Sequence, residues 1–419
     1  MSRRLQGAAV ALLLALLLLP AGLLATPSAP VLPDASAARA LAHLRVLSEA
    51  IGPRAAGSAG DERAIAYVAG ELAALGYGVE RQAFPFLYFE EVRAPEFTVG
   101  ADERVAAVTM LYSAASVDGG VEAELVAAGL GRSEDFAGRP VQGRIALVQR
   151  GEITFRQKVA NAAAAGAAAV VIFNHQAGPP VVGTLSAPSR IPAVAISRDD
   201  GEALLRRLAG GALRARLVVR TIVEQRTSYN VIGVRRGAVA PDEIVVVGGH
   251  RDSVAGGPGA NDNASGVAAA LEAARLLAGV RTARTVHVVA FGAEELGLIG
   301  SQHYVRQATG RLVGMVNLDM VGRGRLQVGN STDDDRLVEL ALAAGRQLGL
   351  TLPRFKLRGP SSDHAAFEMA DVPAVFIHTG DDPAIHTPGD TADRIDGALL
   401  AQAARLAASI VLQAAGTAR

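Results

Sequence analysis

Five residues between positions 250 and 386 are of the types that hold divalent metal ions, and they lie in apolar or glycine-rich segments. They are two histidines and three acids: His250, Asp262, Glu295, Asp319 and His386. Zinc accepts imidazole nitrogen and carboxylate oxygen, and this chain contains no cysteine. A carboxylate that bridges two ions about 3.5–4 Å apart forms a pair that can activate water. The residue types therefore indicate a hydrolytic site with two Zn²⁺ ions.

Each residue taken alone has an ordinary structural explanation. His250 could be a core histidine with satisfied hydrogen bonds, Asp262 could cap a helix, and the Glu294–Glu295 pair could be solvated. Asp319 is harder to explain, because it lies in the apolar segment "MVNLDMVG", where a carboxylate is costly unless it is paired or bound to metal. The argument for a site depends on the positions of all five residues together.

Apolar strand-like runs alternate with helical segments from residue 228 onward, which predicts a mostly parallel sheet covered by helices on both faces. The strands are expected to end near residues 249, 292, 319 and 380. The metal-type residues follow these ends, except Asp262, which precedes the next helix. Ligands bind beyond the carboxyl ends of such strands. We therefore expect one site at one edge of the sheet. Asp262 is the natural bridge, and Asp252 is placed to orient the His250 ring.

Six short motifs occur in an order and spacing that resemble the secreted di-zinc aminopeptidases. They are "GGHRDS" (248–253), "GANDNASG" (259–266), "AEELGLIGS" (293–301), "NLDM" (317–320), "SSDHAAF" (361–367) and "HTPGDT" (386–391). The resemblance covers residues 228–419 and the helical start near 35–90. It implies the zinc exopeptidase fold, a three-layer α/β sandwich with a mostly parallel, mixed central sheet.

The resemblance also assigns roles to individual residues. It implies that His250 and Asp319 are ligands of one zinc, that Glu295 and His386 are ligands of the other, and that Asp262 bridges them. Glu294 matches the general base, and Asp252 matches the acid that supports His250. The peptide bond after Asp262 corresponds to one that is cis in the family.

Other positions in the motifs carry weaker expectations. Several members of the family have a tyrosine before the last ligand, where it stabilises the oxyanion, and here that residue is Ile385. We expect Asp363 and His364 to have structural or supporting roles. The remaining histidines of this region, His287, His303 and His378, match no ligand position and are expected to be structural.

The segment from about residue 93 to 222 is different in character, with short strand-like stretches separated by glycine-rich turns. It resembles the protease-associated domain, a β-rich insertion, through "GRIALVQRG" (143–151), Phe155, Lys158 and Ala165–Ala167. Many members have cysteine at the position of Ile153. The resemblance implies a non-catalytic domain that shapes access to the active site. The expected organisation is thus 34–92 and 223–419 for the peptidase domain, with 93–222 inserted.

The N-terminal residues 1–29 read as a signal peptide. Arg3 and Arg4 precede an apolar run, Gly7–Leu19, which ends at Pro20. We expect a secreted protein, extracellular or in the periplasm or cell envelope, without stable membrane association after cleavage; an uncleaved anchor is the alternative. The chain has 41 basic and 41 acidic residues and no tryptophan, which gives no reason to expect nucleic-acid binding. The sequence does not predict the oligomeric state.

The function predicted is a zinc-dependent exopeptidase that hydrolyses the N-terminal bond of peptides or proteins, using a water between the zinc ions and Glu294 as base and then acid. A carboxypeptidase or dipeptidase of the same fold would need a basic pocket, for which Arg323, Arg325 and Arg358 are available. A glutaminyl cyclase would hold one zinc, whereas five ligands favour two. A non-catalytic, receptor-like binding module would have lost ligands or the base, and this chain retains them.

Overall fold

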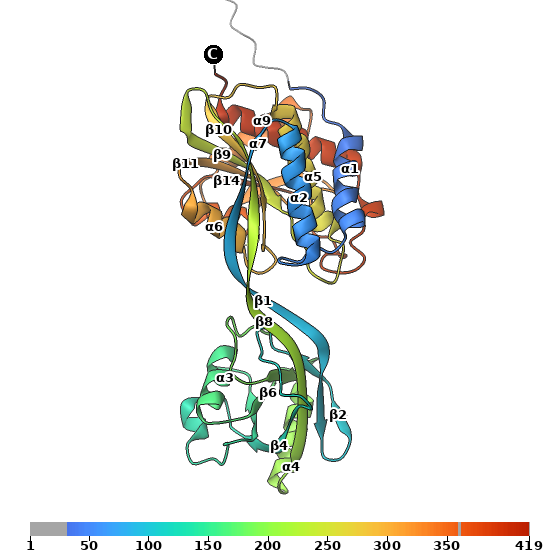
Figure 1. The fold of residues 1–419 in the computed structure, drawn as a ribbon, viewed down its shortest axis with the longest axis vertical. Helices are drawn as coiled ribbons and strands as arrows, with labels where there is room; N and C mark the ends of the chain where they lie inside the picture. Colours follow the sequence, from blue (N-terminus) through green and yellow to red (C-terminus); the bar gives the residue numbers. More distant parts are fainter. Residues whose placement is uncertain (1–31, 359–361, 419) are drawn as a thin grey trace, which may run out of the picture.

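The chain folds into two lobes joined by a two-stranded ribbon (Figure 1). The computed structural model describes residues 32–358 and 362–418, so the predicted signal peptide lies outside the described residues. The ribbon consists of β1 (Gly78–Val99) and β8 (Arg214–Arg235), which pair in antiparallel register from Gly78↔Val234 to Val99↔Ala215. We call the lobe that carries both ends of the described chain the larger lobe, and the other the smaller lobe.

The larger lobe combines the N-terminal helices with everything after the ribbon. Its helices are α1 (Ala37–Arg45), α2 (Ala59–Ala74), α5 (Gly266–Leu277), α6 (Ile299–Gln307), α7 (Arg336–Gln347), α8 (His364–Glu368) and α9 (Gly397–Ala415). Its strands, besides the ribbon, are β9 (Ala240–His250), β10 (Arg284–Phe291), β11 (Arg311–Leu318), β12 (Gln327–Asn330), β13 (Arg354–Lys356) and β14 (Ala374–His378). Short helical turns cover Val46–Ile51, Ala260–Ser265 and Ala392–Arg394.

The sheet of the larger lobe has the strand order β13-β12-β14-β11-β9-β10-β8, with β1 beside β8. The four central strands, β14, β11, β9 and β10, run parallel, and antiparallel β12 and β8 flank them. Side chains of β9 alternate between two cores. Val245 and Val247 pack with α1, α2, α5, α7 and α9, whereas Ile244 and Val246 pack with α6 and α8. The three-layer sandwich with a mostly parallel, mixed sheet is therefore confirmed.

The α9 helix forms part of the core of the larger lobe. By length and composition alone it could cross a membrane, but much of its most apolar stretch is buried inside the lobe. Leu400, Ala404 and Ile410 are fully buried in the same cluster as the central strands. An apolar helix at this position is what a doubly covered sheet requires.

The smaller lobe contains β2 (Glu103–Val105), β3 (Ala107–Thr109), β4 (Val121–Ala127), β5 (Ile145–Gln149), β6 (Ala169–Phe173) and β7 (Ala193–Ile196). Two helices, α3 (Phe155–Ala164) and α4 (Arg198–Ala209), and a short turn, Ser133–Phe136, accompany these strands. Buried Lys158 donates a hydrogen bond of 2.8 Å from Nζ to the Gly151 carbonyl, which closes the turn after β5. β1 and β8 run without interruption through the expected boundaries at 92/93 and 222/223.

Candidate metal centre

The metal-type residues lie where the parallel strands end, as the sequence predicts. His250 is the last residue of β9, Asp319 directly follows β11, and Glu295 lies in the loop after β10. His386 lies in the loop after β14, and Asp262 lies in the turn before α5. Gly249 and Gly266 allow this turn to approach the sheet, because a Cβ atom on either would collide with the Leu318 carbonyl oxygen. The peptide bond between Asp262 and Asn263 is cis, as the resemblance implied.

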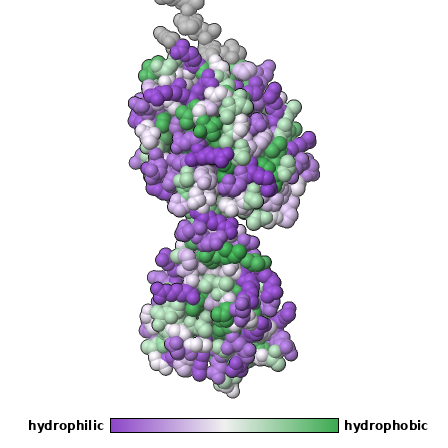
Figure 2. All heavy atoms as spheres, viewed as in Figure 1, coloured by the Kyte–Doolittle hydropathy of each residue, from purple (hydrophilic) through white to green (hydrophobic). Residues whose placement is uncertain are grey.

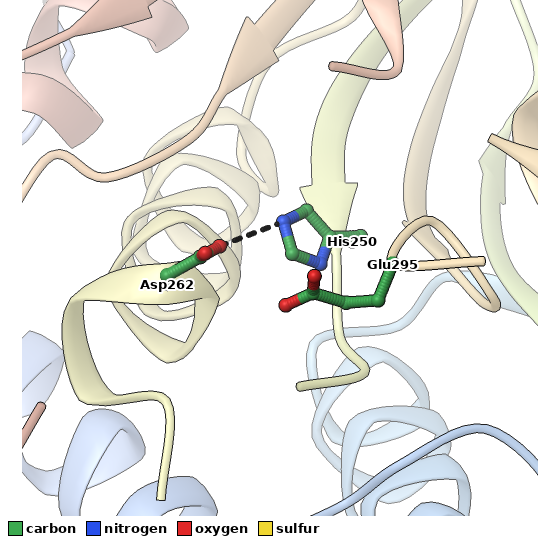
Figure 3. A group of neighbouring side chains, drawn as sticks. All are labelled: His250, Asp262 and Glu295. Carbon is green, nitrogen blue, oxygen red and sulfur yellow. Dashed lines mark ion pairs between the residues drawn. The ribbon is translucent and has the colours of Figure 1, made fainter. Parts of the chain in front are cut away.

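The two carboxylate oxygens of Asp262 face two different histidines. Oδ1 lies 3.1 Å from Nε2 of His250, and Oδ2 lies 3.0 Å from Nε2 of His386. His386 Nε2 is also 3.1 Å from Glu295 Oε2, and His250 Nε2 is 3.6 Å from Asp319 Oδ2. The side chains of His250, Asp262 and Glu295 point into one common space (Figure 3). The structure therefore brings all five predicted residues together, as two groups that share Asp262.

The donors of this cluster suit bound zinc. Oε1 of Glu295 and Oδ1 of Asp319 are buried and have no hydrogen-bond partner among the described residues, which is costly unless a cation binds there. Burial alone would lower the pKa of His250, but Glu294, Asp319 and Asp262 raise it well above its usual value. Hydrogen bonds to Asp262 and Glu295 raise the pKa of His386 to about 10. The cluster therefore creates a strongly negative potential, and its nitrogen and oxygen donors match zinc.

Glu294 and Asp252 lie beside the cluster. Oε2 of Glu294 is 3.8 Å from His250 Nε2, and burial raises the pKa of the Glu294 carboxyl well above its usual range. The backbone N–H groups of Glu294 and Glu295 donate to Oδ1 and Oδ2 of buried Asp252, at 3.2 and 3.3 Å. Nδ1 of His250 lies 3.1 Å from the Asp252 carbonyl and 3.8 Å from its carboxylate. The carboxylate of Asp252 thus holds the 294–295 loop, and its carbonyl faces the His250 ring.

Arg54 supports the loop after β9, and the sequence analysis missed it. Its side chain is fully buried, and its guanidinium donates to the carbonyls of Arg251, Pro258 and Gly259 at 2.6, 2.5 and 2.7 Å. Burial lowers the pKa of Arg54 to about 10, while Asp252 and Asp262 oppose that effect. Arg54 lies in the turn "IGPRAAGSAG" (51–60). A single arginine among apolar and small residues was the one feature of this turn that could have indicated a buried charged side chain.

Other buried polar residues hold the motifs in place. Arg251 forms an ion pair of 2.7 Å with Asp61, and both side chains are fully buried. Asp390 accepts the backbone N–H groups of Asn261 and Asp262 at 2.7 and 3.0 Å. These contacts join segments more than a hundred residues apart, so no local pattern could indicate them.

Some of the residues expected to be structural lie beside the cluster, and others lie away from it. Ser362 donates to Asp319 Oδ2 at 2.7 Å, and the neighbouring His364 is buried, so that residues 362–364 pack against the site. His287 contacts the Tyr304 hydroxyl at 2.7 Å, away from the cluster. His378 is different, because it lines the site cavity and donates through Nδ1 to the Asp319 carbonyl at 2.9 Å.

A cavity of about 810 Å³ opens over the cluster. Its lining is acidic (Asp262, Glu294, Glu295, Asp319, Asp381, Asp382) or apolar (Leu298, Met320, Leu357, Met369, Phe376, Ile385), together with Gly297, Gln302 and the two histidines His378 and His386. No lysine or arginine among the described residues lines it. Arg323 instead pairs with Asp382 at 3.2 Å, and Arg325 donates to the Thr351 carbonyl. A basic pocket for a substrate carboxylate is therefore missing from the described part of the cavity.

Comparison with known proteins places the chain in a family. Residues 230–411 match the model of peptidase family M28, and residues 121–204 match the PA domain. The chain is 34% identical to aminopeptidase YwaD of Bacillus subtilis, over 94% of this chain and 92% of that protein. The chain belongs to peptidase family M28. The predicted family, with its inserted protease-associated domain, is thereby confirmed.

Solved structures agree with this assignment. The aminopeptidase from Aneurinibacillus sp. strain AM-1 is 36% identical and superimposes with a TM-score of 0.78, covering 92% of this chain and 95% of that one. The zinc aminopeptidase BSAP from Bacillus subtilis is 34% identical with a TM-score of 0.71, covering 93% and 97%. These comparisons confirm that this M28 chain is an enzyme of the metallo-aminopeptidase class.

Proposed function

We propose that this protein is a secreted aminopeptidase that removes N-terminal residues from peptides, with two zinc ions held by His250, Asp262, Glu295, Asp319 and His386. The observation that carries the proposal is the position of Asp262, whose two oxygens each face a different histidine. A carboxylate in this position can bind two ions at once. His250 and Asp319 would be the other ligands of one ion, and His386 and Glu295 would be those of the second ion. The solved zinc aminopeptidase relative supports zinc as the metal.

We infer that Glu294 transfers the proton during hydrolysis. When bound, the zinc ions would lower the pKa of a water molecule and polarise the scissile carbonyl. The Glu294 carboxylate takes the proton from the attacking water and returns it to the departing amine. Burial raises the pKa of this carboxyl, which favours holding the proton between the two steps. Asp252 fixes this geometry by accepting the N–H groups of residues 294 and 295.

The chemistry of the cavity favours recognition of a substrate amine. Asp381 and the carboxylates of the cluster can accept hydrogen bonds from an α-ammonium group, and no lysine or arginine of the described residues lines the cavity to bind a carboxylate. The apolar residues of the lining suit an uncharged first side chain. Ile385 cannot donate a hydrogen bond to the oxyanion, so the contribution of the family's tyrosine is lost at this position.

A panel of aminoacyl anilides with free and blocked amines tests the reaction. We expect turnover of the free-amine substrates only, loss of turnover after chelation, and recovery with zinc. Cleavage restricted to blocked substrates, or full activity after complete metal removal, would contradict the proposal.

Metal content tests the role of Asp262 separately. The wild type is expected to hold two zinc ions per chain by elemental analysis, and Asp262→Asn is expected to hold fewer than one. Asp242→Asn is the matched control, because Asp242 is exposed beside the opposite edge of the sheet. A full complement of two ions in Asp262→Asn would refute the bridging role.

We also propose export, and the division of the chain into residues 34–92 and 223–419 with an insertion at 93–222. The leader pattern before residue 30 supports export. N-terminal sequencing of the protein recovered outside the cytoplasm would show whether the leader is removed, and an intact Met1 would contradict the proposal.

A further inference from the structure

Exposed aliphatic side chains of this protein concentrate in two places. Nine large hydrophobic residues are exposed among the described residues. Two of them, Met369 and Ile385, line the site cavity. Five others lie on or beside the smaller lobe, and we call them the apolar face: Val92, Leu111, Val117, Val182 and Ile222. Val117 and Val182 are 70% and 71% exposed, and apolar side chains that are exposed together on one surface can mark a binding site.

The apolar face lies where the ribbon enters the smaller lobe. The Arg220 guanidinium donates to the Val117 carbonyl, and Val92 occupies the irregular register opposite Arg220. Leu111 forms a bridge with Thr184, two residues after Val182. Figure 2 shows hydrophobic surface at this end of the smaller lobe, just below the narrow waist. The five residues thus share the end of the lobe that is nearest to the larger lobe.

Strand register places this end on the same side as the active-site cavity. β8 is antiparallel to β10, with Val231 opposite Ala290, and β10 pairs with β9 so that Phe291 lies opposite His250. β8 therefore passes the level of His250 near Asn230 and continues beyond the edge where the proposed ligands lie. From Asn230 to Ile222 it covers eight further residues, or roughly 26 Å at about 3.3 Å per residue.

The space between the lobes fits an extended chain. The ribbon is anchored to the larger lobe by Phe84 and Phe86, which pack with Ala56 and Ala293, and by a hydrogen bond from Arg226 to the Gly57 carbonyl. It meets the smaller lobe at Phe89, which lies opposite Val223 and whose ring centroid is 5.6 Å from that of Tyr112, and then at Thr221, whose Oγ1 donates to the Ser113 carbonyl.

The three residue steps from Val223 to Arg226 span about 10 Å. Sheets that pack face to face lie about 10 Å apart, so the space between the lobes matches one extended chain. A folded domain of 100 residues has a radius of gyration of about 13 Å and does not fit into this space.

We propose that the apolar face binds the downstream part of the substrate, and that the enzyme therefore prefers long peptides with an apolar residue about eight positions beyond the cleaved bond. This inference rests on the proposed aminopeptidase function. The chain continues from the cavity, past the apolar rim residues Met369 and Ile385, across the gap to the apolar face. Contacts so far from the reacting bond lower KM for long substrates and leave the chemistry at the first residue unchanged.

The test compares peptides of four, six, eight, ten and twelve residues that share the same first two residues and carry leucine from the seventh position onward. For the wild type we expect kcat/KM to rise at least tenfold between six and ten residues. Val117→Glu/Val182→Glu should abolish this rise, because two carboxylates replace the apolar surface. Val239→Glu is the matched control, since Val239 is 69% exposed at the opposite edge of the sheet.

A single-residue anilide separates this inference from the proposed function. Its turnover should be equal in the wild type, the double variant and the control, which also shows that the variants fold. A kcat/KM independent of length, or a length effect that survives in the double variant, overturns the inference while leaving anilide cleavage intact. A wild-type dimer that the double substitution converts to monomers would also overturn it, because the apolar face would then join two copies.

Discussion

The substitution Arg54→Met tests the view that one buried guanidinium holds the metal-binding loop. Arg54 donates to three carbonyls of the segment 251–259, and the side chain is inaccessible to solvent. A buried carbonyl that loses its partner costs about 1–3 kcal/mol, and removing one member of a buried charged network costs about 3–5 kcal/mol. We expect Arg54→Met to lower the free energy of unfolding by about 4 kcal/mol, a large share of a typical total.

The same substitution should weaken zinc binding. The carbonyls that Arg54 holds lie between His250 and Asp262, so their release frees two proposed ligands. Supporting contacts of this kind change metal affinity by about 10–100-fold. The assays are urea unfolding in a chelator and in saturating zinc, and competition with a chromogenic chelator for the metal.

Two further variants make the result interpretable. Arg54→Lys keeps the charge but cannot reach all three carbonyls, and we expect about half the destabilisation. Arg63→Met is the control, because Arg63 is exposed and donates only to the Ile51 carbonyl at 2.9 Å. If Arg54→Met unfolded within about 1 kcal/mol of Arg63→Met and bound zinc within threefold of the wild type, the reasoning would be refuted.

Three further predictions follow from the same structure. Glu294→Gln should lower kcat by about 10²–10⁴ while retaining two zinc ions, and a loss below tenfold would exclude Glu294 as the general base. Chelation should lower the melting temperature as well as abolish activity, because an ion that binds only the folded state stabilises it; an unchanged melting temperature would argue against a site built from these buried residues. Burial lowers the pKa of His287 from 6.5 to about 4, so the unfolded chain binds a proton between these values and the folded one does not. Stability should therefore fall as pH drops from 6.5 to 4, by at most about 3 kcal/mol, and His287→Gln should reduce that slope in urea titrations.

The sequence was sufficient to predict that these five residues lie together, because its evidence is local. Each proposed ligand follows or precedes a recognisable element, and parallel strands bring their carboxyl ends to one edge. The helical start near 35–90 was also predicted, and it contains α1, the turn Val46–Ile51 and α2. The roles of the individual ligands stay predictions until metal content and kinetics are measured.

The buried contacts that support the site could not be predicted from the sequence, because they join segments that are far apart in the chain. The pairing of Arg251 with Asp61 joins residues 190 positions apart, and Arg54 reaches carbonyls about 200 positions away. A charged residue in such a pair has the same local sequence as an exposed one, so burial is visible only after the chain is folded. The ribbon was missed for a related reason. The sequence indicated a change of character at about residue 93, but the long partner β8 supports β1 as far as Val99.

The arrangement of charges supports the proposed roles of both the metal ions and Arg54. Asp252, Asp262 and Asp319 are buried, Glu294 and Glu295 are nearly so, and like charges at such distances cannot all ionise without cations. Two zinc ions would bring four positive charges, and Arg54 supplies a permanent one from behind the loop. The cation from the protein and the cations from solution therefore act on the same carboxylates from opposite sides. Their contributions should be coupled: because Arg54→Met weakens zinc binding, it should destabilise the zinc-saturated protein more than the metal-free one, by about 1.4–2.7 kcal/mol for each ion whose affinity falls 10–100-fold.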